Sequence, residues 1–249
     1  MSGPSFYKNV VPLDRERHRN LRLKTLGSVD FAAKAHYVPI VAVELYEAAR
    51  DYPIVFTGDD NAVPVAVLGL RDGENLFVEP NGQWARGTYV PIFIRRYPFI
   101  LSRTAPESTD YAVCIDESCE GLSDSEGEPL FDENGKETEL VAKVLGFLQE
   151  ALTEAERTRR FVERLKQLDL LTVQSMQVRD PAGRIFKMND FRVVDENKLK
   201  ALGDDVIGDL HRSGYLGCIY AHLLSLGNAS RLAFRVPVDE ESRAAAGNG

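Results

Sequence analysis

The chain has 249 residues, of which 44% are hydrophobic and 27% are charged, and its formal net charge is −8. These values are typical of a globular protein with enough apolar residues for one sizeable core, and they argue against a disordered chain. The negative charge argues against nucleic acid as a partner, because phosphates are bound by basic surfaces. The longest uncharged apolar runs, residues 38–43 and 63–70, are far shorter than a membrane-spanning helix, so no membrane insertion is expected.

The N-terminal residues and the cysteines bear on the cellular compartment. The charged residues Asp14 to Arg17 follow soon after the start, so the first residues contain no apolar secretory core. The three cysteines, Cys114, Cys119 and Cys218, cannot all pair with one another. We therefore expect reduced thiols and a cytoplasmic protein.

Short strands and turns are expected in the first half of the chain. Between residues 31 and 101, proline and glycine interrupt the apolar runs at short intervals, which favours strands over long helices. We predict strands over residues 54–57, 63–70, 75–78 and 99–101, and short helices over residues 43–50 and 89–96. Asp72-Gly73 and Asn81-Gly82 predict hairpin turns, so we expect a meander of antiparallel strands.

Residues 116–139 form an acidic segment. It holds ten Asp and Glu residues and a single basic residue, Lys136. Because crowded carboxylates repel one another and cannot be buried unpaired, we expect residues 118–134 to form an exposed, mobile loop. The segment lacks the twelve-residue ligand pattern of a calcium loop. It is either a solvated loop or an acidic surface that repels nucleic acid and receives a basic partner.

A long amphipathic helix is expected in the second half. Apolar residues recur every three or four positions from Val141 to Leu168, which predicts a helix over about residues 139–167. Such a helix is about 40 Å long, and it either wraps the core or joins two halves of the molecule. After it we expect strands at 171–178, 185–188 and 191–194, a turn at 181–183, a helix capped by Asp195 and ending at residue 202, and a helix at 215–226.

Together these elements predict an α+β fold. It has an antiparallel, strand-rich N-terminal half, the long amphipathic helix and a helix-rich C-terminal half around one compact core. We expect a single globular domain over residues 1–240 and a disordered tail over residues 241–249.

Common catalytic and metal-binding motifs are absent from the sequence. It has no glycine-rich dinucleotide motif, no P-loop, no His-Glu-x-x-His and no Gly-x-Ser-x-Gly. No two of its four histidines lie three or four residues apart, and no histidine lies near Cys114 or Cys119. Because a metal ion needs several converging ligands, we expect neither a metal site nor a cofactor.

The densest cluster of aromatic and basic residues lies at positions 84–99. It contains the only tryptophan, two adjacent arginines and several aromatic residues. Aromatic faces beside guanidinium groups suit an anionic or sugar-like ligand, or a protein interface. The alternative is structural: the aromatic residues belong to the core and the arginines pair with acids. The candidate binding residues are Trp84, Arg95, Arg96, Tyr97 and His222.

Several short segments along the chain are distinctive. They are Tyr37-Val-Pro-Ile, Tyr52-Pro-Ile-Val-Phe, Gly82-Gln-Trp, Arg95-Arg-Tyr-Pro-Phe, Gly127-Glu-Pro-Leu-Phe-Asp and Gly214-Tyr-Leu-Gly-Cys-Ile-Tyr-Ala-His. In this order they resemble the SapC-like family of bacteria, over nearly the whole chain. That family takes its name from bacterial surface-array protein loci, and its members are similar to proteins encoded near outer-membrane receptors and flavin-dependent halogenase-like enzymes. The resemblance implies a bacterial origin and a link to surface or uptake systems, without catalytic residues.

We therefore expect a non-catalytic binding or accessory protein that serves another protein of a bacterial surface-protein or outer-membrane uptake pathway. The alternative is an enzyme that acts on a peptide or a sugar, with Arg95, Arg96, Tyr97 and His222 as its first candidate residues. Perturbed ionisable groups in a deep pocket would favour the enzyme, whereas a flat aromatic patch would favour the binding protein.

Overall fold

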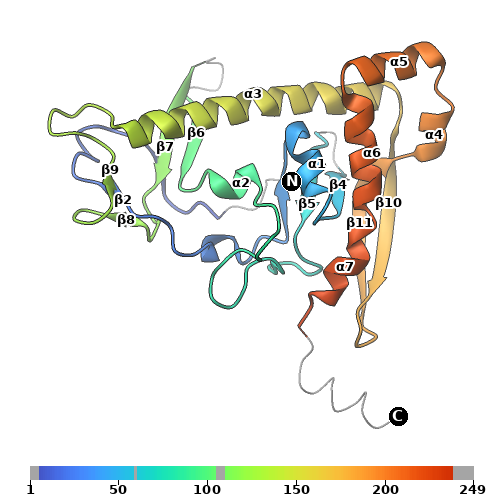
Figure 1. The fold of residues 1–249 in the computed structure, drawn as a ribbon, viewed down its shortest axis with the longest axis horizontal. Helices are drawn as coiled ribbons and strands as arrows, with labels where there is room; N and C mark the ends of the chain where they lie inside the picture. The colour runs from blue at the N-terminus through green and yellow to red at the C-terminus, as the bar shows by residue number, and fades with distance from the viewer. Residues whose placement is uncertain (1–5, 59–60, 105–109, 238–249) are drawn as a thin grey trace, which may run out of the picture.

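The computed structural model describes residues 6–58, 61–104 and 110–237 (Figure 1). The tail predicted over residues 241–249 lies outside the described residues. Within the described ranges, no helix is both long enough and apolar enough to cross a membrane.

The strands of the described residues form three antiparallel sheets. The largest has five strands in the order β10-β11-β4-β5-β3, which are Leu171–Arg179, Ile185–Val194, Ile54–Thr57, Pro64–Val67 and Tyr37–Pro39. A second sheet has the order β1-β7-β6, which are Val10–Pro12, Tyr111–Asp116 and Phe99–Arg103. The third has the order β8-β2-β9, which are Leu122–Ser123, Arg22–Leu23 and Glu128–Pro129. Strands β10 and β11 from the second half therefore complete a sheet that the first half begins.

The helices pack around these sheets. The long α3 is Glu139–Gln167, and the later helices are α4 (Glu196–Lys200), α5 (Asp204–Arg212), α6 (Tyr215–Ser225) and α7 (Asn228–Phe234). The first half contributes the short helices η1 (Asp30–Ala32), η2 (Ala42–Glu44), α1 (Leu45–Ala48) and α2 (Ile92–Arg95). Helix α6 lies along β4 and β11 (Figure 1). These elements confirm the α+β class, and α3 has the bounds that the apolar periodicity predicts.

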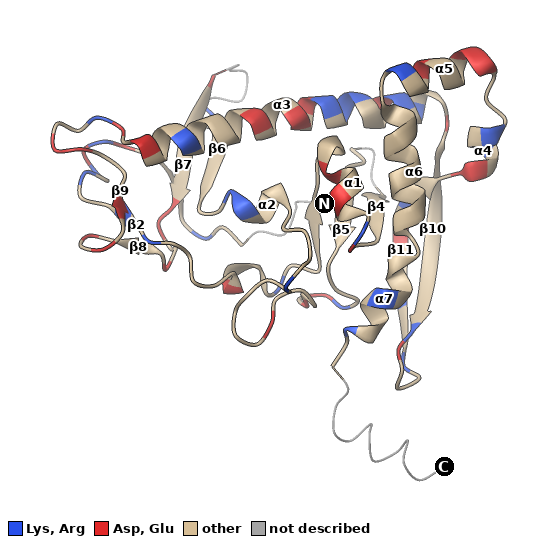
Figure 2. Ribbon diagram, in the orientation of Figure 1, with Lys and Arg blue, Asp and Glu red and all other residues tan. Residues whose placement is uncertain are grey.

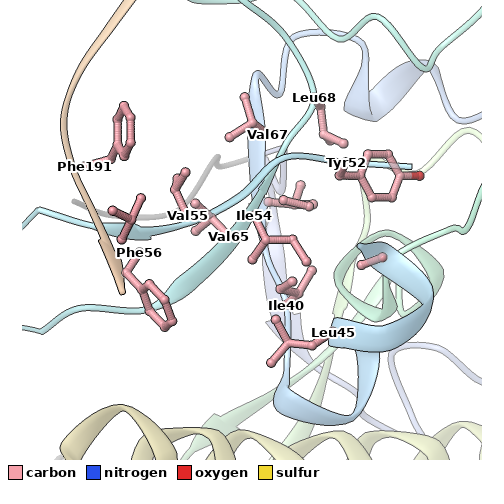
Figure 3. Close-up of a cluster of buried hydrophobic side chains, with 14 of the residues drawn as sticks. Ile40, Leu45, Tyr52, Ile54, Val55, Phe56, Val65, Val67, Leu68 and Phe191 are labelled. Atoms are coloured by element: carbon pink, nitrogen blue, oxygen red, sulfur yellow. The ribbon is translucent and has the colours of Figure 1, made fainter. Parts of the chain in front are cut away.

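Two clusters of buried apolar side chains lie beneath these elements. The larger one lies against the five-stranded sheet and includes Phe56 of β4 (Figure 3). The smaller one consists of Phe99, Ile115, Leu130, Phe131, Val141 and Leu148. Helix α3 contributes to both, with Leu148 in the smaller cluster and Phe161 and Leu165 in the larger. The helix therefore joins two clusters, whereas one compact core was expected. Figure 2 shows charged residues along the length of α3.

The strand predicted at residues 75–78 is wrong. Its first residue folds the chain into a turn instead: the Asn75 side-chain oxygen accepts the Phe77 N–H at 2.9 Å, and its Nδ2 donates to the Ala32 carbonyl at 3.0 Å. An isolated bridge between Val78 and Trp84 and the bond from the Leu76 N–H to the Leu68 carbonyl at 2.8 Å remain of the expected pairing. An asparagine side chain that bonds its own backbone two residues ahead competes with a strand.

The acidic segment contains two short strands and several buried residues. It contains β8 and β9, which pair with β2, and its residues Leu130 and Phe131 are buried. One of its carboxylates, Asp116, is also fully buried, and it accepts hydrogen bonds from the backbone N–H groups of Lys8, Asn9 and Ser118 and from the Ser118 hydroxyl. The prediction of an exposed loop over residues 118–134 is therefore wrong in part: residues 124–128 are exposed, but Leu130 and Phe131 anchor the segment to the smaller cluster.

Candidate binding site

The short helix α2 places the two adjacent arginines. Pro91 precedes the helix with φ −57° and ψ 146°, so the helix starts at Ile92 and is shorter than the predicted 89–96. Successive residues of a helix point about 100° apart. Arg95 and Arg96 accordingly lie over different aromatic rings.

Arg95 is exposed and belongs to a polar cluster with Tyr89 and Glu44. Its guanidinium carbon lies 5.6 Å from the centre of the Tyr89 ring and 5.7 Å from that of Phe147 in α3, and its Nη2 donates to the Tyr89 hydroxyl at 3.1 Å. No described carboxylate lies within ion-pairing distance of Arg95, although its charge acts on Glu44. The side chain is therefore oriented but not neutralised by an ion pair.

Glu44 is a buried acid that ties η2 to α2. One carboxylate oxygen accepts the Tyr89 hydroxyl at 2.9 Å and the Ile92 N–H at 2.7 Å, and the other accepts the Val41 N–H at 2.8 Å. Burial raises the pKa of Glu44, and the hydrogen bonds and Arg95 oppose that shift. Burial and the nearby Glu44 raise the pKa of Tyr89 to about 12. All three hydrogen bonds hold the carboxylate in place, which gives this acid a structural role.

Trp84 extends the same polar cluster into the larger apolar cluster. Its indole N–H lies 3.1 Å from the Tyr52 hydroxyl and 3.2 Å from the Tyr89 carbonyl oxygen, and the Tyr52 hydroxyl donates to the same carbonyl. Its ring stacks on Phe77 with centroids 6.1 Å apart. Trp84 is half-buried and holds the chain segment that carries Tyr89.

Arg96 lies on the other side of α2 and has a different environment. Its guanidinium carbon is 4.0 Å from the centre of the Phe93 ring and 5.9 Å from that of Tyr7. A hydrogen bond from Arg96 and its charge act to lower the pKa of Tyr7, which burial nevertheless raises. The Nε atom of Arg96 is buried and has no hydrogen-bond partner, and no described carboxylate is within ion-pairing distance. Arg96 is thus a half-buried cation without an acidic partner in the described part of the chain.

A groove opens beside Arg96, between α2, the middle of α3 and the adjoining ends of β3 and β5. We call it the α2–α3 groove; its volume is about 490 Å³. Its apolar lining includes Pro39, Ile40, Val41, Ala62, Val63, Pro64, Phe93 and Val162. Arg159 on its α3 side bonds to both Glu156 and Glu163, at 3.0 and 2.5 Å, so its charge is fully used within the protein and the three side chains together carry a net charge of −1. The groove therefore offers apolar contacts and the cations Arg96 and Lys166, and no described carboxylate lies within ion-pairing distance of Arg96.

A second hollow of about 620 Å³ adjoins the α2–α3 groove. It shares Ile92 and Ala151 with the α2–α3 groove, and its lining includes Phe147, over which Arg95 lies. Each arginine is thus next to a separate hollow along α3. The sequence gives no signal for Phe147 or Glu44, because both reach the site from elements distant in the chain.

Tyr97 and His222 lie elsewhere. Tyr97 is buried, its ring stacks on Phe31 with centroids 4.0 Å apart, and burial raises its pKa. His222 is fully buried on α6, where its ring nitrogens contact the Ile54 carbonyl at 2.9 Å and the Val194 N–H at 3.0 Å. None of these contacts joins Tyr97 or His222 to the grooves. Of the five candidates, the structure joins Trp84 and Arg95 through Tyr89, whereas Arg96 lies apart from them at the α2–α3 groove.

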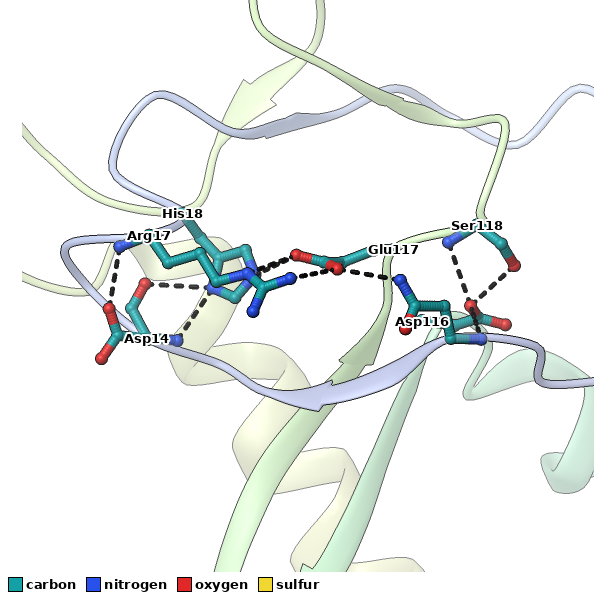
Figure 4. A network of polar contacts seen from close by, with 7 residues as sticks. Asp14, Arg17, His18, Asp116, Glu117 and Ser118 are labelled. Atoms are coloured by element: carbon teal, nitrogen blue, oxygen red, sulfur yellow. Dashed lines mark hydrogen bonds and ion pairs between the residues drawn. The ribbon is translucent and has the colours of Figure 1, made fainter.

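A second polar network joins the N-terminal segment to the end of β7 (Figure 4). His18 is buried, its Nδ1 accepts the Asp14 N–H at 2.9 Å, and its Nε2 lies 3.2 Å from the Glu117 carboxylate. The Ser118 hydroxyl donates to Asp116 at 2.7 Å and not to the histidine. Serine, histidine and carboxylates gather here, but the described hydrogen bonds do not join Ser118 to His18, so they do not form the serine–histidine pair of covalent catalysis. The network fastens the N-terminal segment to β7.

Within the described residues, no group of three or more His, Cys, Asp and Glu side chains could hold a metal ion. No curated protein and no solved structure matches the chain. The family model SapC matches residues 13–232, which include every strand except β1 and nearly all of the helices described above. The chain therefore belongs to the SapC family.

Proposed function

We propose that the protein is a non-catalytic binding or accessory protein of a bacterial surface-protein or outer-membrane uptake pathway, and that it works in the cytoplasm. Membership of the SapC family supports the pathway, because the family is named after surface-array protein loci. The cysteines support the compartment: Cys114, Cys119 and Cys218 are all buried and unpaired.

The proposed ligand is a segment of another protein that carries a carboxylate beside apolar side chains, and it occupies the α2–α3 groove. The observation that carries this proposal is Arg96, a cation stacked on Phe93 at the groove, with no described carboxylate as its partner. Guanidinium groups bind carboxylates strongly and in a fixed geometry. The apolar lining of the groove accepts the rest of the segment, as is usual for ligand sites that are mostly apolar with a few polar groups.

The test compares Arg96→Ala, Arg95→Ala and the control Arg86→Ala, an exposed arginine with no hydrogen bond or ion pair to a described residue. The partner is captured from the source cell with the full chain, identified by mass spectrometry and purified for affinity measurements. Arg96→Ala should weaken its binding by roughly tenfold to a hundredfold, the effect of losing a charge-assisted hydrogen bond. Arg86→Ala should leave affinity unchanged.

Melting temperature separates recognition from structure. Arg96→Ala removes a hydrogen bond to Tyr7 and the contact with the Phe93 ring, so the melting temperature should fall by a few degrees while partner affinity falls as well. Arg95→Ala removes a bond to Tyr89 and a charge that favours ionised Glu44, so it should lower the melting temperature and leave partner affinity near that of the wild type. Unchanged partner affinity together with a clear fall in melting temperature for Arg96→Ala would contradict the proposal.

A further inference from the structure

Strand β10 forms one end of the five-stranded sheet and pairs, among the described strands, with β11 alone. It has nine residues, and Val173 is 57% exposed. Gln174, Ser175 and Gln177 are also exposed. A long edge strand presents a row of unpaired backbone groups to any strand that can approach it.

The hydrogen bonds at the two ends of the hairpin show which backbone groups face outward. The Asp195 N–H donates to the Leu170 carbonyl at 2.8 Å, and the Asp180 N–H donates to the Arg184 carbonyl at 3.0 Å. Residues of an antiparallel strand alternate between facing one neighbour and facing the other. The even-numbered residues of β10 therefore bond to β11, and the odd-numbered residues 171, 173, 175, 177 and 179 direct their N–H and C=O groups to the open edge.

The irregularity in this hairpin leaves the open edge intact. Gln174 pairs with Phe191 and Met176 pairs with Met188, so one residue of β10 faces two residues of β11. The extra residue is in β11, where Asp190 has φ +59°. A bulge in the edge strand itself would interrupt its outward groups, whereas this bulge is in the inner strand. The outward alternation of β10 is therefore continuous.

The edge is complementary to itself. A second copy running antiparallel, centred on Ser175, would place Val173 opposite Gln177 and Leu171 opposite Arg179, so that each outward-facing residue meets another. No charged side chain lies between Leu171 and Val178, so this pairing sets no like charges opposite one another. Edge strands that avoid association commonly carry lysine, proline or inward-pointing charged residues. Residues 171–178 contain no lysine, no proline and no other charged residue.

We propose that two copies of this chain associate through β10, in antiparallel register about Ser175, and so join their five-stranded sheets into one. The surface is separate from the α2–α3 groove, and this inference does not depend on the proposed function. Light scattering on the full chain should give twice the mass of one chain at concentrations of about 100 µM, and dilution should give a fitted dissociation constant.

Two double variants test the register with the same two positions. Val173→Lys with Gln177→Lys places like charges opposite each other twice, and dimerisation should weaken at least tenfold. Val173→Lys with Gln177→Glu places opposite charges together twice, and the dimer should be retained. Both positions are exposed, so the melting temperature and circular dichroism of each variant should remain near those of the wild type.

A wild-type chain that is monomeric at that concentration overturns the proposal. A dimer that both variants leave intact places the interface on another surface, and loss of the dimer in both variants rejects the register about Ser175. Capture of a different protein's strand by monomeric wild type would likewise replace the second copy as the occupant.

Discussion

His222 fills a place that backbone hydrogen bonds would otherwise occupy. The ladder between β11 and β4 comprises only the pairs Phe191 with Thr57 and Arg192 with Phe56. Beyond them the imidazole lies between the strands, accepting the Val194 N–H on Nε2 and donating from Nδ1 to the Ile54 carbonyl. This arrangement requires the neutral ring with its proton on Nδ1. Burial lowers the pKa of His222 to about 4, which keeps the ring neutral.

The first prediction concerns pH. His222 binds a proton more readily in the unfolded chain, where its ordinary pKa is 6.5, than in the folded one. Its contribution to stability is therefore fully present above about pH 6.5 and is lost as the pH falls towards 4, by about 3 kcal/mol in total. Denaturant titrations at several pH values measure it. His222→Gln, whose amide can both donate and accept hydrogen bonds, should remove this pH dependence. The control His211→Asn, at an exposed position, should retain it. The assignment to His222 would be disproved if the free energy of unfolding changed equally with pH in the wild type and both variants.

A second prediction concerns the carboxylate of Glu44. Glu44→Gln replaces one carboxylate oxygen with an NH₂ group, which donates hydrogen bonds and cannot accept them. Depending on which oxygen is replaced, either the Val41 N–H or the Ile92 N–H loses its acceptor. One buried backbone donor is left without a partner, so the free energy of unfolding should fall by about 1 to 3 kcal/mol. The control is Glu47→Gln, because Glu47 is exposed and its carboxylate pairs, among the residues that the structure describes, with the exposed Arg50 alone. A variant at Glu44 as stable as the one at Glu47 would show that the buried bonds contribute nothing.

At the scale of elements, the bulge in β11 requires a glycine at position 58, directly after β4. A Cβ added to Gly58 would lie 2.1 Å from the Asp190 carbonyl oxygen, closer than two atoms can approach. Gly58→Ala must therefore displace the backbone of β11 and should destabilise the protein by about 2 to 4 kcal/mol. Gly146→Ala in α3 is the matched comparison, because nothing lies within 4 Å of its Cβ, and it should stabilise by about 0.5 to 1 kcal/mol. Thermal or denaturant unfolding measures both, and equal effects of one sign would contradict this reading of the bulge.

Elements with local signals could be predicted from the sequence. The apolar periodicity gave α3 its bounds, and Asp195 caps α4 with bonds from the Asn197 and Lys198 N–H groups, as its residue type indicates. The turn at Asn75 has a local component, because the asparagine side chain bonds the Phe77 N–H, but its second bond, to Ala32 43 positions away, could not be predicted. The separate α5 was missed although Val206, Ile207 and Leu210 lie at helical spacing, because nine residues hold only this one set of apolar positions and are too few for a recurring pattern.

The candidate site likewise contains residues that the sequence marks and residues that only folding brings there. Trp84, Arg95 and Arg96 are close in sequence, and their aromatic and basic character marked them. Phe147, which lies under Arg95, and Glu44, which holds Tyr89, come from other elements, and only the folded chain brings them there. His222 has the residue type of a functional group, yet its burial between two strands follows from tertiary packing that no local pattern reveals.

At the scale of the whole molecule, α3 links the two apolar clusters. It is one uninterrupted helix of 29 residues, and the partly buried Leu122 packs against both clusters as well. Because a helix loses its hydrogen bonds cooperatively, loosening one end of α3 should weaken the packing at the other. We therefore expect the two clusters to unfold in a single transition, although they lie in different parts of the molecule.

The last prediction tests this coupling with Leu148→Ala. Leu148 is buried in the smaller cluster, so its truncation should lower the free energy of unfolding by about 2 to 4 kcal/mol. Trp84, the only tryptophan, packs on the larger cluster, so its fluorescence reports on the part of the molecule that the substitution does not touch. If α3 couples the clusters, the fluorescence midpoint and the far-ultraviolet circular dichroism midpoint should move down together in denaturant. The exposed Leu224→Ala should move neither one appreciably. A Leu148→Ala protein whose fluorescence midpoint stays at the wild-type value while its dichroism midpoint falls would show that the clusters unfold independently.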